Sequence, residues 1–576
     1  MDLTKVNSTL EVLFPSHGEE IFHRIEQIID NHKSSTSNRR WSAKQSSLSE
    51  RDITLITYAD QVYESGYRPL VSLRRFLDKY LKNNITSVHI LPFYPYSSDD
   101  GFSVIDYKSV SEDLGNWGDV QSLGESFHLM LDAVINHVSI KHQWFQSFLN
   151  SDSPYENYFI QQDSNFDIRA VTRPRSTPLF HSFETKSGSK QIWTTFSRDQ
   201  VDLNFKNSDV VFACIDVLLF YAQQGASIIR LDAIGYIWKE TGTSCLNLSQ
   251  AHLLVKIFRS VLHETYPHVQ LITETNVPHE ENIAYFGNGQ DEAQMVYQFS
   301  LAPLVLYSFL FGNALALTQW ATDLEFPETD ATVFNFLASH DGIGVLPARG
   351  FLSDEQIENM VEKVNQKGGL VSYRDTDKGK VTYEINATWL SAIADPDELL
   401  EIQIKKVVTS YAIAMCMKGV PGIYIHSIFG TPNDMAGYHF TGHARTVNRR
   451  RLRMAEVETA LETPTTMAAQ IFTRMQVLFS VRTGEPLFHP RMKQIILHLH
   501  ESVFALIRSD STQKSKVICL HNVSSLFVDV MLDVTKLGAT KFSACNLVTN
   551  EQCTLEGTAL ITLQAYDFMW LKLTEK

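Results

Sequence analysis

The sequence has no excess of positive charge and no cysteine spacing typical of a metal site. Its 50 lysines and arginines are outnumbered by 65 aspartates and glutamates, which gives a formal net charge of −15. This balance opposes long-range attraction to phosphate backbones or anionic lipid, so neither nucleic acid nor a membrane is expected as a partner. The six cysteines form no C-x-x-C pair, and most stand among apolar residues, as reduced thiols do. We therefore expect a cytoplasmic protein.

A secretory signal is also missing, because the first residues carry no basic segment followed by a long apolar one. One stretch without charges, residues 295–317, is long enough to cross a bilayer. Gln298, Pro303 and Asn313 interrupt it. A strand followed by a buried helix explains the stretch without lipid, and we adopt that interpretation.

A chain of 576 residues is too long for one hydrophobic core, so a large domain with added modules is expected. From residue 53 onward, short apolar runs alternate with amphipathic segments. The runs predict eight β-strands, at residues 53–58, 87–91, 128–135, 226–231, 269–273, 293–299, 332–338 and 422–426. Eight strands alternating with helices predict an α/β fold, the (β/α)₈ TIM barrel.

The other segments predict additions to this barrel. Residues 1–50 have helical spacing and predict a helical N-terminal extension. Two gaps between strands far exceed the usual loop length, and they predict inserted domains at 140–222, after strand 3, and at 345–405, after strand 7. Alternating strands predict a C-terminal β-sandwich over residues 491–576. The barrel itself then comprises residues 51–139, 223–344 and 406–490.

Three predicted strands end in carboxylates. Asp232 follows the fourth strand, Glu274 follows the fifth, and Asp341 stands beside His340 after the seventh. The carboxyl ends of barrel strands are where this architecture places its reacting groups. Cleavage of a glycosidic bond needs one acid to protonate the leaving oxygen and one carboxylate to meet the anomeric carbon. The three acids therefore indicate glycosyl chemistry.

Together with the end of the third strand, these positions resemble the four conserved regions of the α-amylase superfamily. The third strand contributes Asn136 and His137, and the four regions occur in the family's order. The resemblance implies that Asp232 is the nucleophile, Glu274 the general acid/base and Asp341 the stabiliser of the transition state in a retaining reaction. A single strand-end acid would more often be a helix cap or loop group, so the order of all four regions carries the resemblance.

The segment 89–107 narrows the resemblance to the sucrose phosphorylase subfamily. There, the acid matching Asp99 holds hydroxyls of a terminal glucose, and the aromatic residue matching Phe102 forms the floor beneath its ring, so the pocket closes after one sugar. Arg230 lies two residues before Asp232, on the same side of the strand, and is expected to keep that carboxylate ionised. The family pattern further implies contacts with glucose from His137, His340 and Arg445.

The resemblance also implies an acceptor side that binds phosphate. Arginine forks suit phosphate oxygens, and the long loops supply several. Residues expected to contact phosphate or the acceptor are Arg173, Arg175, Tyr236, Asn276, Tyr383 and Glu384. Outside the family context, Arg173, Arg175 and Arg445 could instead be solvated or ion-paired surface groups.

Three positions depart from sucrose phosphorylases. Those enzymes typically carry His where this chain has Asn276, Gln where it has Glu384, and an aromatic residue where it has Thr172. All three lie near the leaving-group side. Other segments resemble the glucosylglycerate phosphorylases of the same subfamily, namely residues 272–287, 291–301 and 383–386.

The resemblance therefore implies a retaining phosphorylase that splits 2-O-α-glucosylglycerate with phosphate into α-glucose 1-phosphate and glycerate. Alternatives are the same chemistry on sucrose or glucosylglycerol, a hydrolase or transglucosylase, and a non-catalytic barrel. The intact acids argue against the last. We expect no metal and no other cofactor, small-molecule substrates as partners, and a monomer or homodimer.

Overall fold

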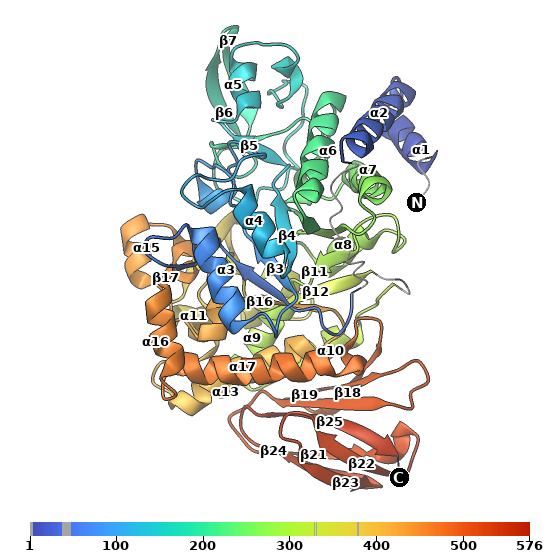
Figure 1. Cartoon of the computed structure of the whole chain (residues 1–576), viewed down its shortest axis with the longest axis vertical. Coiled ribbons are helices and arrows are strands. Elements are labelled where there is room, and N and C mark those ends of the chain that lie inside the picture. Colours follow the sequence, from blue (N-terminus) through green and yellow to red (C-terminus); the bar gives the residue numbers. More distant parts are fainter. Residues whose placement is uncertain (1–3, 37–47, 328, 330, 377–378, 576) are drawn as a thin grey trace.

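The centre of the molecule is a closed barrel of eight parallel strands (Figure 1). A computed structural model describes residues 4–36, 48–327, 329, 331–376 and 379–575. In chain order the barrel strands are β1 (Thr54–Thr57), β3 (Ser87–Ile90), β4 (His128–Ala133), β9 (Ala226–Leu231), β10 (Gln270–Thr273), β11 (Met295–Tyr297), β12 (Thr332–Phe336) and β16 (Val420–Tyr424). The predicted barrel is confirmed, and its last strand begins two residues before the predicted start at 422.

Helices surround the barrel and cover its apolar outer face. The main ones are α3 (Pro69–Tyr80), α4 (Trp117–Gly124), α6 (Ser208–Gln223), α7 (Ser249–Thr265), α8 (His279–Ile283), α9 (Leu301–Phe311), α10 (Leu315–Thr322), α13 (Leu400–Cys416) and α17 (Met467–Gly484). The charge-free stretch 295–317 comprises β11, α9 and the start of α10. It is therefore a strand followed by a buried helix, as predicted. Within the described part of the chain, no helix combines the length and apolar character that a membrane span needs.

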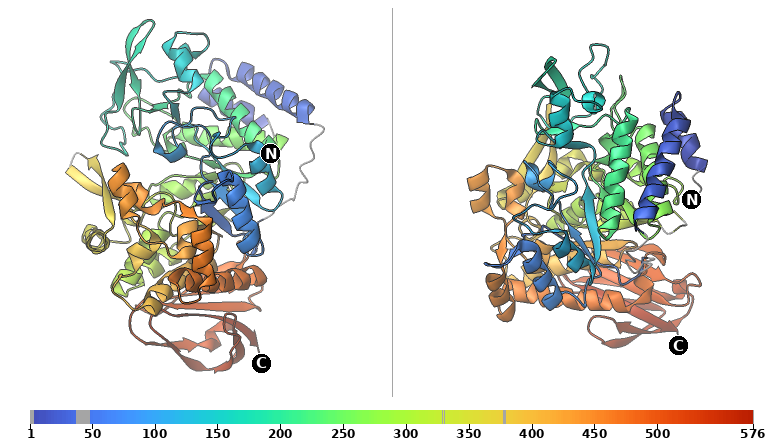
Figure 2. Two further views of the ribbon diagram at one scale, coloured as in Figure 1. Left: turned by 60° about the vertical axis from the view of Figure 1, so that its left-hand side comes forward. Right: turned by 45° about the horizontal axis from the view of Figure 1, so that its top comes forward.

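The N-terminal extension packs on the barrel. Its helices α1 (Thr4–Leu13) and α2 (Gly18–Thr36) lie against α6 and α7 (Figure 2). Leu10 and Ile25 are fully buried there, and Lys33 pairs with Glu264 of α7 at 2.6 Å. Residues 37–47 of the expected extension lie outside the described residues. The extension therefore covers two barrel helices on the side away from α15 (Met435–Thr441).

The first insertion follows β4. It contains β5 (His137–Ser139) paired with β8 (Gln200–Asp202), helix α5 (Gln143–Leu149), and the hairpin of β6 (Phe180–Thr185) and β7 (Gly188–Trp193). Helix α6, which lies within the expected range 140–222, packs against β4, β9 and α7 and is a barrel helix. The expected range is therefore too long, because an apolar helix at its end was counted with the insertion.

The second insertion follows β12. It contains a three-stranded sheet of β13 (Ile343–Gly344), β15 (Gly379–Asn386) and β14 (Leu370–Thr376), together with α11 (Asp354–Gln366) and α12 (Trp389–Ile393). Barrel helix α13 begins at Leu400, before the expected boundary at 405. Both insertions leave the carboxyl ends of their strands, so both reach the face where the strand-end acids lie.

The C-terminal residues form a β domain at the opposite end of the molecule from the β6–β7 hairpin (Figure 1). A six-stranded sheet contains β18 (Lys493–His500), β19 (Val503–Ser509), β20 (Lys516–Asn522), β25 (Phe568–Glu575), β22 (Lys541–Asn546) and β23 (Gln552–Glu556). A second sheet pairs β21 (Val528–Asp533) with β24 (Thr558–Leu563). Apolar side chains of both sheets share one core, as expected of a sandwich.

Candidate active site

A narrow cavity of about 80 Å³ lies at the carboxyl ends of the barrel strands. Both insertions contribute to its wall. Most of the site residues expected from the sequence line it, namely Asp99, Phe102, His137, Arg175, Asp232, Tyr236, Glu274, Asn276, His340, Asp341, Tyr383 and Arg445. Arg230 and Glu384 lie one layer behind the wall, and Arg173 lines a separate hollow outside it.

Asp232 and Glu274 flank a single guanidinium group. Arg230 Nη1 lies 2.8 Å from Asp232 Oδ1, and Arg230 Nη2 lies 3.8 Å from Glu274 Oε2. The backbone N–H of Ala233 donates to Glu274 Oε2 at 3.1 Å. Ala233 has a φ of +50°, a left-handed conformation uncommon for a residue other than glycine. The residue after Asp232 thus orients Glu274, so the two acids share one polar frame.

Arg230 is held in turn by a buried acid. Asp132 Oδ1 lies 2.5 Å from Arg230 Nη1, and His89 Nε2 lies 2.7 Å from Asp132 Oδ2. Burial acts to raise the pKa of Asp132, but His89 and Arg230 lower it below its ordinary value. Removing one partner of a buried ion pair typically costs about 3–5 kcal/mol. This network therefore fixes the guanidinium that the two acids flank.

The protonation states of the two acids follow from this geometry. Burial raises the pKa of both Asp232 and Glu274, and Arg230 opposes that effect on each. Asp232 has the shorter contact with Arg230, so its ionised form is the better stabilised. A proton shared by the pair therefore resides on Glu274. In this state one acid is able to attack and the other is able to donate a proton.

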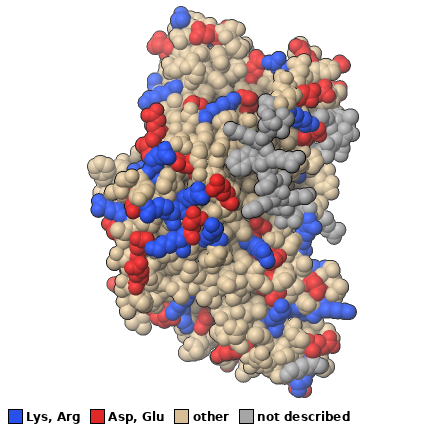
Figure 3. Space-filling model, viewed as in Figure 1, with Lys and Arg blue, Asp and Glu red and all other residues tan. Residues whose placement is uncertain are grey.

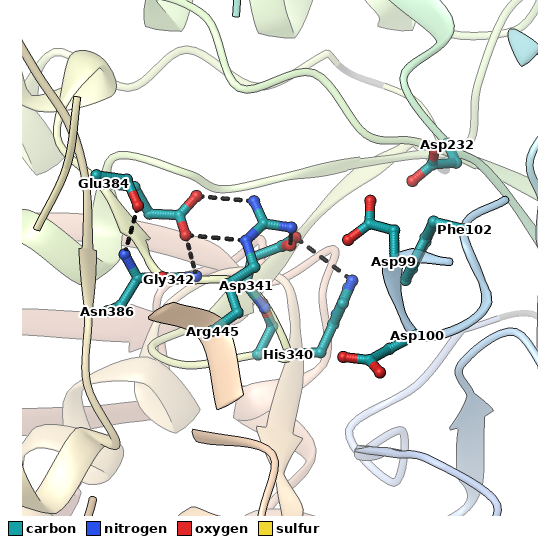
Figure 4. Close-up of polar contacts among 12 residues, drawn as sticks. Asp99, Asp100, Phe102, Asp232, His340, Asp341, Gly342, Glu384, Asn386 and Arg445 are labelled. Carbon is teal, nitrogen blue, oxygen red and sulfur yellow. Dashed lines mark hydrogen bonds and ion pairs between the residues drawn. The ribbon is translucent and has the colours of Figure 1, made fainter. Parts of the chain in front are cut away.

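On another wall of the cavity, Arg445 links Asp341 to Glu384 (Figure 4). Arg445 Nη1 lies 2.5 Å from Asp341 Oδ1, while its Nε and Nη2 donate to Glu384 at 3.0 and 2.8 Å. Glu384 also accepts the backbone N–H of Gly342 at 3.0 Å. Burial acts to raise the pKa of Asp341, but Arg445 and other nearby arginines lower it below its ordinary value. Asp341 is therefore ionised, and Glu384 acts on the cavity through Arg445.

The second insertion approaches the site closely because glycine stands at two positions. A Cβ on Gly342 would lie 2.4 Å from Glu384 Cγ, and a Cβ on Gly344 would lie 2.7 Å from Asn276 Nδ2. A larger residue at position 342 would also meet the backbone oxygen of Ile385 at 2.6 Å, and one at position 344 would displace the Asn276 amide. These contacts bring Tyr383 and Asn276 to the same cavity wall.

One end of the cavity is lined by a turn in an unusual conformation. Asp99 and Asp100 have φ values of +54° and +47°, and Gly101 has a φ of +110°. A Cβ on Gly101 would lie 2.7 Å from a backbone oxygen, so glycine is required there. Gln200 of the first insertion donates to Asp99 Oδ2 at 3.2 Å, and Arg449 pairs with Asp100 at 2.5 Å. The turn therefore holds the Asp99 carboxylate in the cavity wall.

Aromatic rings line this same end. Phe102 and His340 are stacked, with ring centroids 4.8 Å apart and an interplanar angle of 4°. Burial lowers the pKa of His137 and of His340, so both imidazoles are neutral. His137 Nε2 lies 2.9 Å from Phe102 O, and the buried His340 Nδ1 has no hydrogen-bond partner among the described residues. An apolar ring beside neutral polar groups suits the face and hydroxyls of a sugar.

The opposite end of the cavity is made of loop residues with unused polar atoms. Arg175 lies 5.6 Å from the centre of the Tyr383 ring and, among the described residues, its side chain donates only to the neighbouring carbonyl of Pro174, at 3.5 Å. Asn276 Oδ1 is buried without a hydrogen-bond partner in the described part of the chain. Burial raises the pKa of Tyr236 and Tyr383, so both phenols keep their protons. This end therefore offers one guanidinium and several neutral polar groups.

Some residues at the cavity were not predicted from the sequence. Phe196 and Gln200, near the end of the first insertion, line the wall. Arg449 donates to the backbone oxygen of His340 at 2.8 Å. Arg449 could have been identified from the sequence, because it lies four residues after Arg445. Phe196 and Gln200 could not, because only the fold of the first insertion brings them to the cavity. Among the described residues, no three His, Cys, Asp or Glu side chains are grouped to hold a metal ion.

Comparison with known proteins places the chain in a family. The family described as "Alpha amylase, catalytic domain" matches residues 77–346. A glucosylglycerate phosphorylase from Spirochaeta thermophila is 44% identical over 514 residues, which cover 89% of this chain and 87% of that protein. A sucrose phosphorylase from Agrobacterium vitis is 29% identical over 464 residues, covering 76% of this chain and 89% of that protein. The chain belongs to the sucrose phosphorylase subfamily of the α-amylase family.

The fold is also that of a solved structure. The solved structure of sucrose 6F-phosphate phosphorylase from Thermoanaerobacter thermosaccharolyticum has a TM-score of 0.73 and 23% sequence identity, and covers 89% of this chain and 99% of that chain. The two proteins share the fold. The 44% identity with the glucosylglycerate phosphorylase, over most of both chains, shows that the chain is a glucosyl-transferring enzyme of the α-amylase family.

Proposed function

We propose that the protein is a retaining phosphorylase that converts 2-O-α-glucosylglycerate and inorganic phosphate reversibly into α-glucose 1-phosphate and glycerate. The 44% identity with a glucosylglycerate phosphorylase carries the choice of substrate. The reaction class is supported by two carboxylates that flank one guanidinium, between an aromatic end and a cationic end of the cavity.

In the first half-reaction, Asp232 attacks the anomeric carbon and Glu274 protonates the leaving oxygen. Glycerate departs, and an ester of the glucosyl group with Asp232 remains. Arg230 keeps Asp232 ionised, and the N–H of Ala233 orients Glu274. The ionised Asp341 stabilises the positive charge that develops on the sugar ring.

In the second half-reaction, a phosphate oxygen attacks the same carbon from the side that glycerate has left. The bond to Asp232 breaks, and the now ionised Glu274 accepts the proton from phosphate. Two displacements at one carbon restore the α configuration. Arg175 is suited to attract phosphate to this side, because its guanidinium has no carboxylate partner among the described residues.

The aromatic end of the cavity supports a substrate with one glucose unit. Asp99 is placed to accept sugar hydroxyls, and the stacked rings of Phe102 and His340 provide an apolar surface for the sugar ring. We assign to the strained turn that carries Asp99 the role of limiting this end to one sugar. A long α-glucan needs an open groove, so this arrangement favours a small glucoside.

The cationic end supports a small anionic acceptor. We assign the glycerate carboxylate to Arg175 and a glycerate hydroxyl to the unpaired Asn276 Oδ1. Tyr236 and Tyr383 supply further hydroxyl donors. Arg445 is neutralised by Glu384. Among the described residues that line this cavity, Arg175 is therefore the guanidinium that is free to bind an anion.

We also propose that the enzyme acts in the cytoplasm on small molecules. All six cysteines are free and four of them are buried, which suits a reducing compartment.

The test of this function measures glucose 1-phosphate and free glucose released from glucosylglycerate and from sucrose, each with and without phosphate. We expect glucose 1-phosphate from glucosylglycerate only when phosphate is present. The same product from sucrose at a higher rate would replace the substrate assignment. Free glucose at the same rate with and without phosphate would make the enzyme a hydrolase.

A further inference from the structure

A second hollow lies outside the catalytic cavity and shares one residue with it. Its volume is about 570 Å³, and it is lined by residues of the first insertion and by Arg374 of β14 in the second insertion. Arg175 lines both this hollow and the catalytic cavity. A ligand in the hollow is therefore one residue away from the acceptor end.

Among the described residues, arginine is the only charged residue type that lines this hollow. Arg169, Arg173, Arg175 and Arg374 contribute to its wall, and no Asp or Glu of the described part of the chain does. Surface arginines elsewhere commonly lie beside acids, and Figure 3 shows the two signs interspersed over one face of the molecule. An example is Arg474, which forms a bidentate pair with Glu401 at 3.0 and 2.8 Å. The hollow thus differs from the ordinary surface of this acidic protein.

The four arginines are not equivalent. Arg169 donates twice to Asp167, at 2.9 and 2.7 Å, and Arg173 donates to the backbone oxygen of Thr177. Arg374 has no ion pair or hydrogen bond within the described part of the chain, and its buried Nε has no partner there. Burial lowers the pKa of Arg374, and nearby Arg349 lowers it further. A partly desolvated guanidinium without a partner is costly, and an anion would relieve that cost.

The proposed reaction gives this arrangement a use. Glycerate and phosphate are both anions, and both need Arg175 at the acceptor end. Like charges held close together repel, so phosphate cannot occupy Arg175 while glycerate is bound there. A second cation outside the cavity would hold the incoming phosphate until the carboxylate has left.

We propose that Arg374 and Arg175 form an outer anion site that binds inorganic phosphate between the two insertions and delivers it to the acceptor end. The proposal rests on the phosphorylase function proposed above. Arg374 holds phosphate in the hollow, and Arg175 receives it as the catalytic cavity empties. Because β14 carries Arg374 and the first insertion carries Arg175, bound phosphate also links the two insertions.

The test compares Arg374→Met with a matched control, the double variant Asp167→Asn/Arg169→Met. The control removes an arginine from the same hollow together with its own carboxylate, so the net charge of the hollow's surroundings is unchanged. We expect Arg374→Met to raise the KM for phosphate about tenfold, which is the effect of losing one charge-assisted hydrogen bond. The kcat at saturating phosphate should not change. The control is expected to match the wild type, and Arg374→Lys to recover part of the loss.

A binding experiment separates this proposal from the proposed function. Calorimetric titration with inorganic phosphate alone, without any sugar, is expected to show weaker binding to Arg374→Met than to the wild type or the control. This result would stand even if the protein proved not to be a phosphorylase. Equal phosphate affinity in all three proteins would overturn the outer site. A rise in the KM for glycerate without a rise in that for phosphate would overturn its assignment to phosphate.

Discussion

The two ends of the catalytic cavity are built on different principles. At the glucose end, the residues come mainly from the barrel and its first turns, and the turn that carries Asp99 is held by the ion pair between Asp100 and Arg449. At the acceptor end, loop residues leave Arg175 and Asn276 Oδ1 without matching partners in the described structure. The glucose end suits a glucosyl group that stays bound through both half-reactions. The unpaired end suits a place where one anion replaces another.

Removing the reactive acids should have the largest effect, because they stand between the two ends and serve both. We expect Asp232→Asn to lower kcat by on the order of 10⁴-fold or more, and Glu274→Gln by on the order of 10²–10⁴-fold. Glucose 1-phosphate formation measures both. With α-glucosyl fluoride, whose leaving group needs no proton, formation of the glucosyl enzyme should recover in Glu274→Gln but not in Asp232→Asn.

The control for these variants is Asp529→Asn, an exposed acid on β21 of the C-terminal domain, which should leave activity unchanged. Melting temperatures should show that the variants remain folded. Near-normal turnover in either catalytic variant would contradict the assigned roles.

The pH dependence should distinguish the two acids. In the proposed mechanism Glu274 is the acid of the first half-reaction, and burial raises its pKa. Activity that needs its proton is therefore present below the raised pKa and falls about tenfold per pH unit above it. We expect kcat/KM for glucosylglycerate to show this alkaline decline, and kcat/KM for α-glucosyl fluoride to lack it. If kcat/KM declines equally with both donors, the group that titrates is not Glu274.

A smaller effect should follow from changing the acceptor end alone. Asn276→Ala removes the amide assigned to a glycerate hydroxyl, and we expect the KM for glycerate in the reverse reaction to rise about threefold. The KM for glucose 1-phosphate should stay the same, because the glucose end is untouched. Equal increases in both constants would show that the two ends are not independent.

The sequence predicted the fixed parts of the molecule well. The barrel strands appear as apolar runs, and a strand's end fixes where its next residue points, so Asp232, Glu274 and Asp341 could be placed from the sequence. Arg230 could also be placed beside Asp232, because alternate residues of a strand share a side. Local patterns suffice where secondary structure determines geometry.

The loop-built parts could not be predicted in the same way. Arg374 reaches the outer hollow only because β14 pairs with β15 and both lie across from the first insertion. Gln200 meets Asp99 across a long sequence separation. The Ala233 N–H contact depends on a left-handed backbone that no residue pattern indicates. The end of the first insertion was misplaced because α6, a barrel helix, is apolar like a buried insertion helix.

The central claim is that an unpaired guanidinium at the acceptor end directs the glucosyl enzyme toward phosphate. The most direct measurement is the ratio of glucose 1-phosphate to free glucose formed from glucosylglycerate at one fixed phosphate concentration, in the wild type and in Arg175→Met. We predict that the wild type forms mainly glucose 1-phosphate and that the variant shifts at least tenfold toward glucose, the loss expected for a charge-assisted contact. An unchanged ratio, with both products reduced equally, would contradict the account.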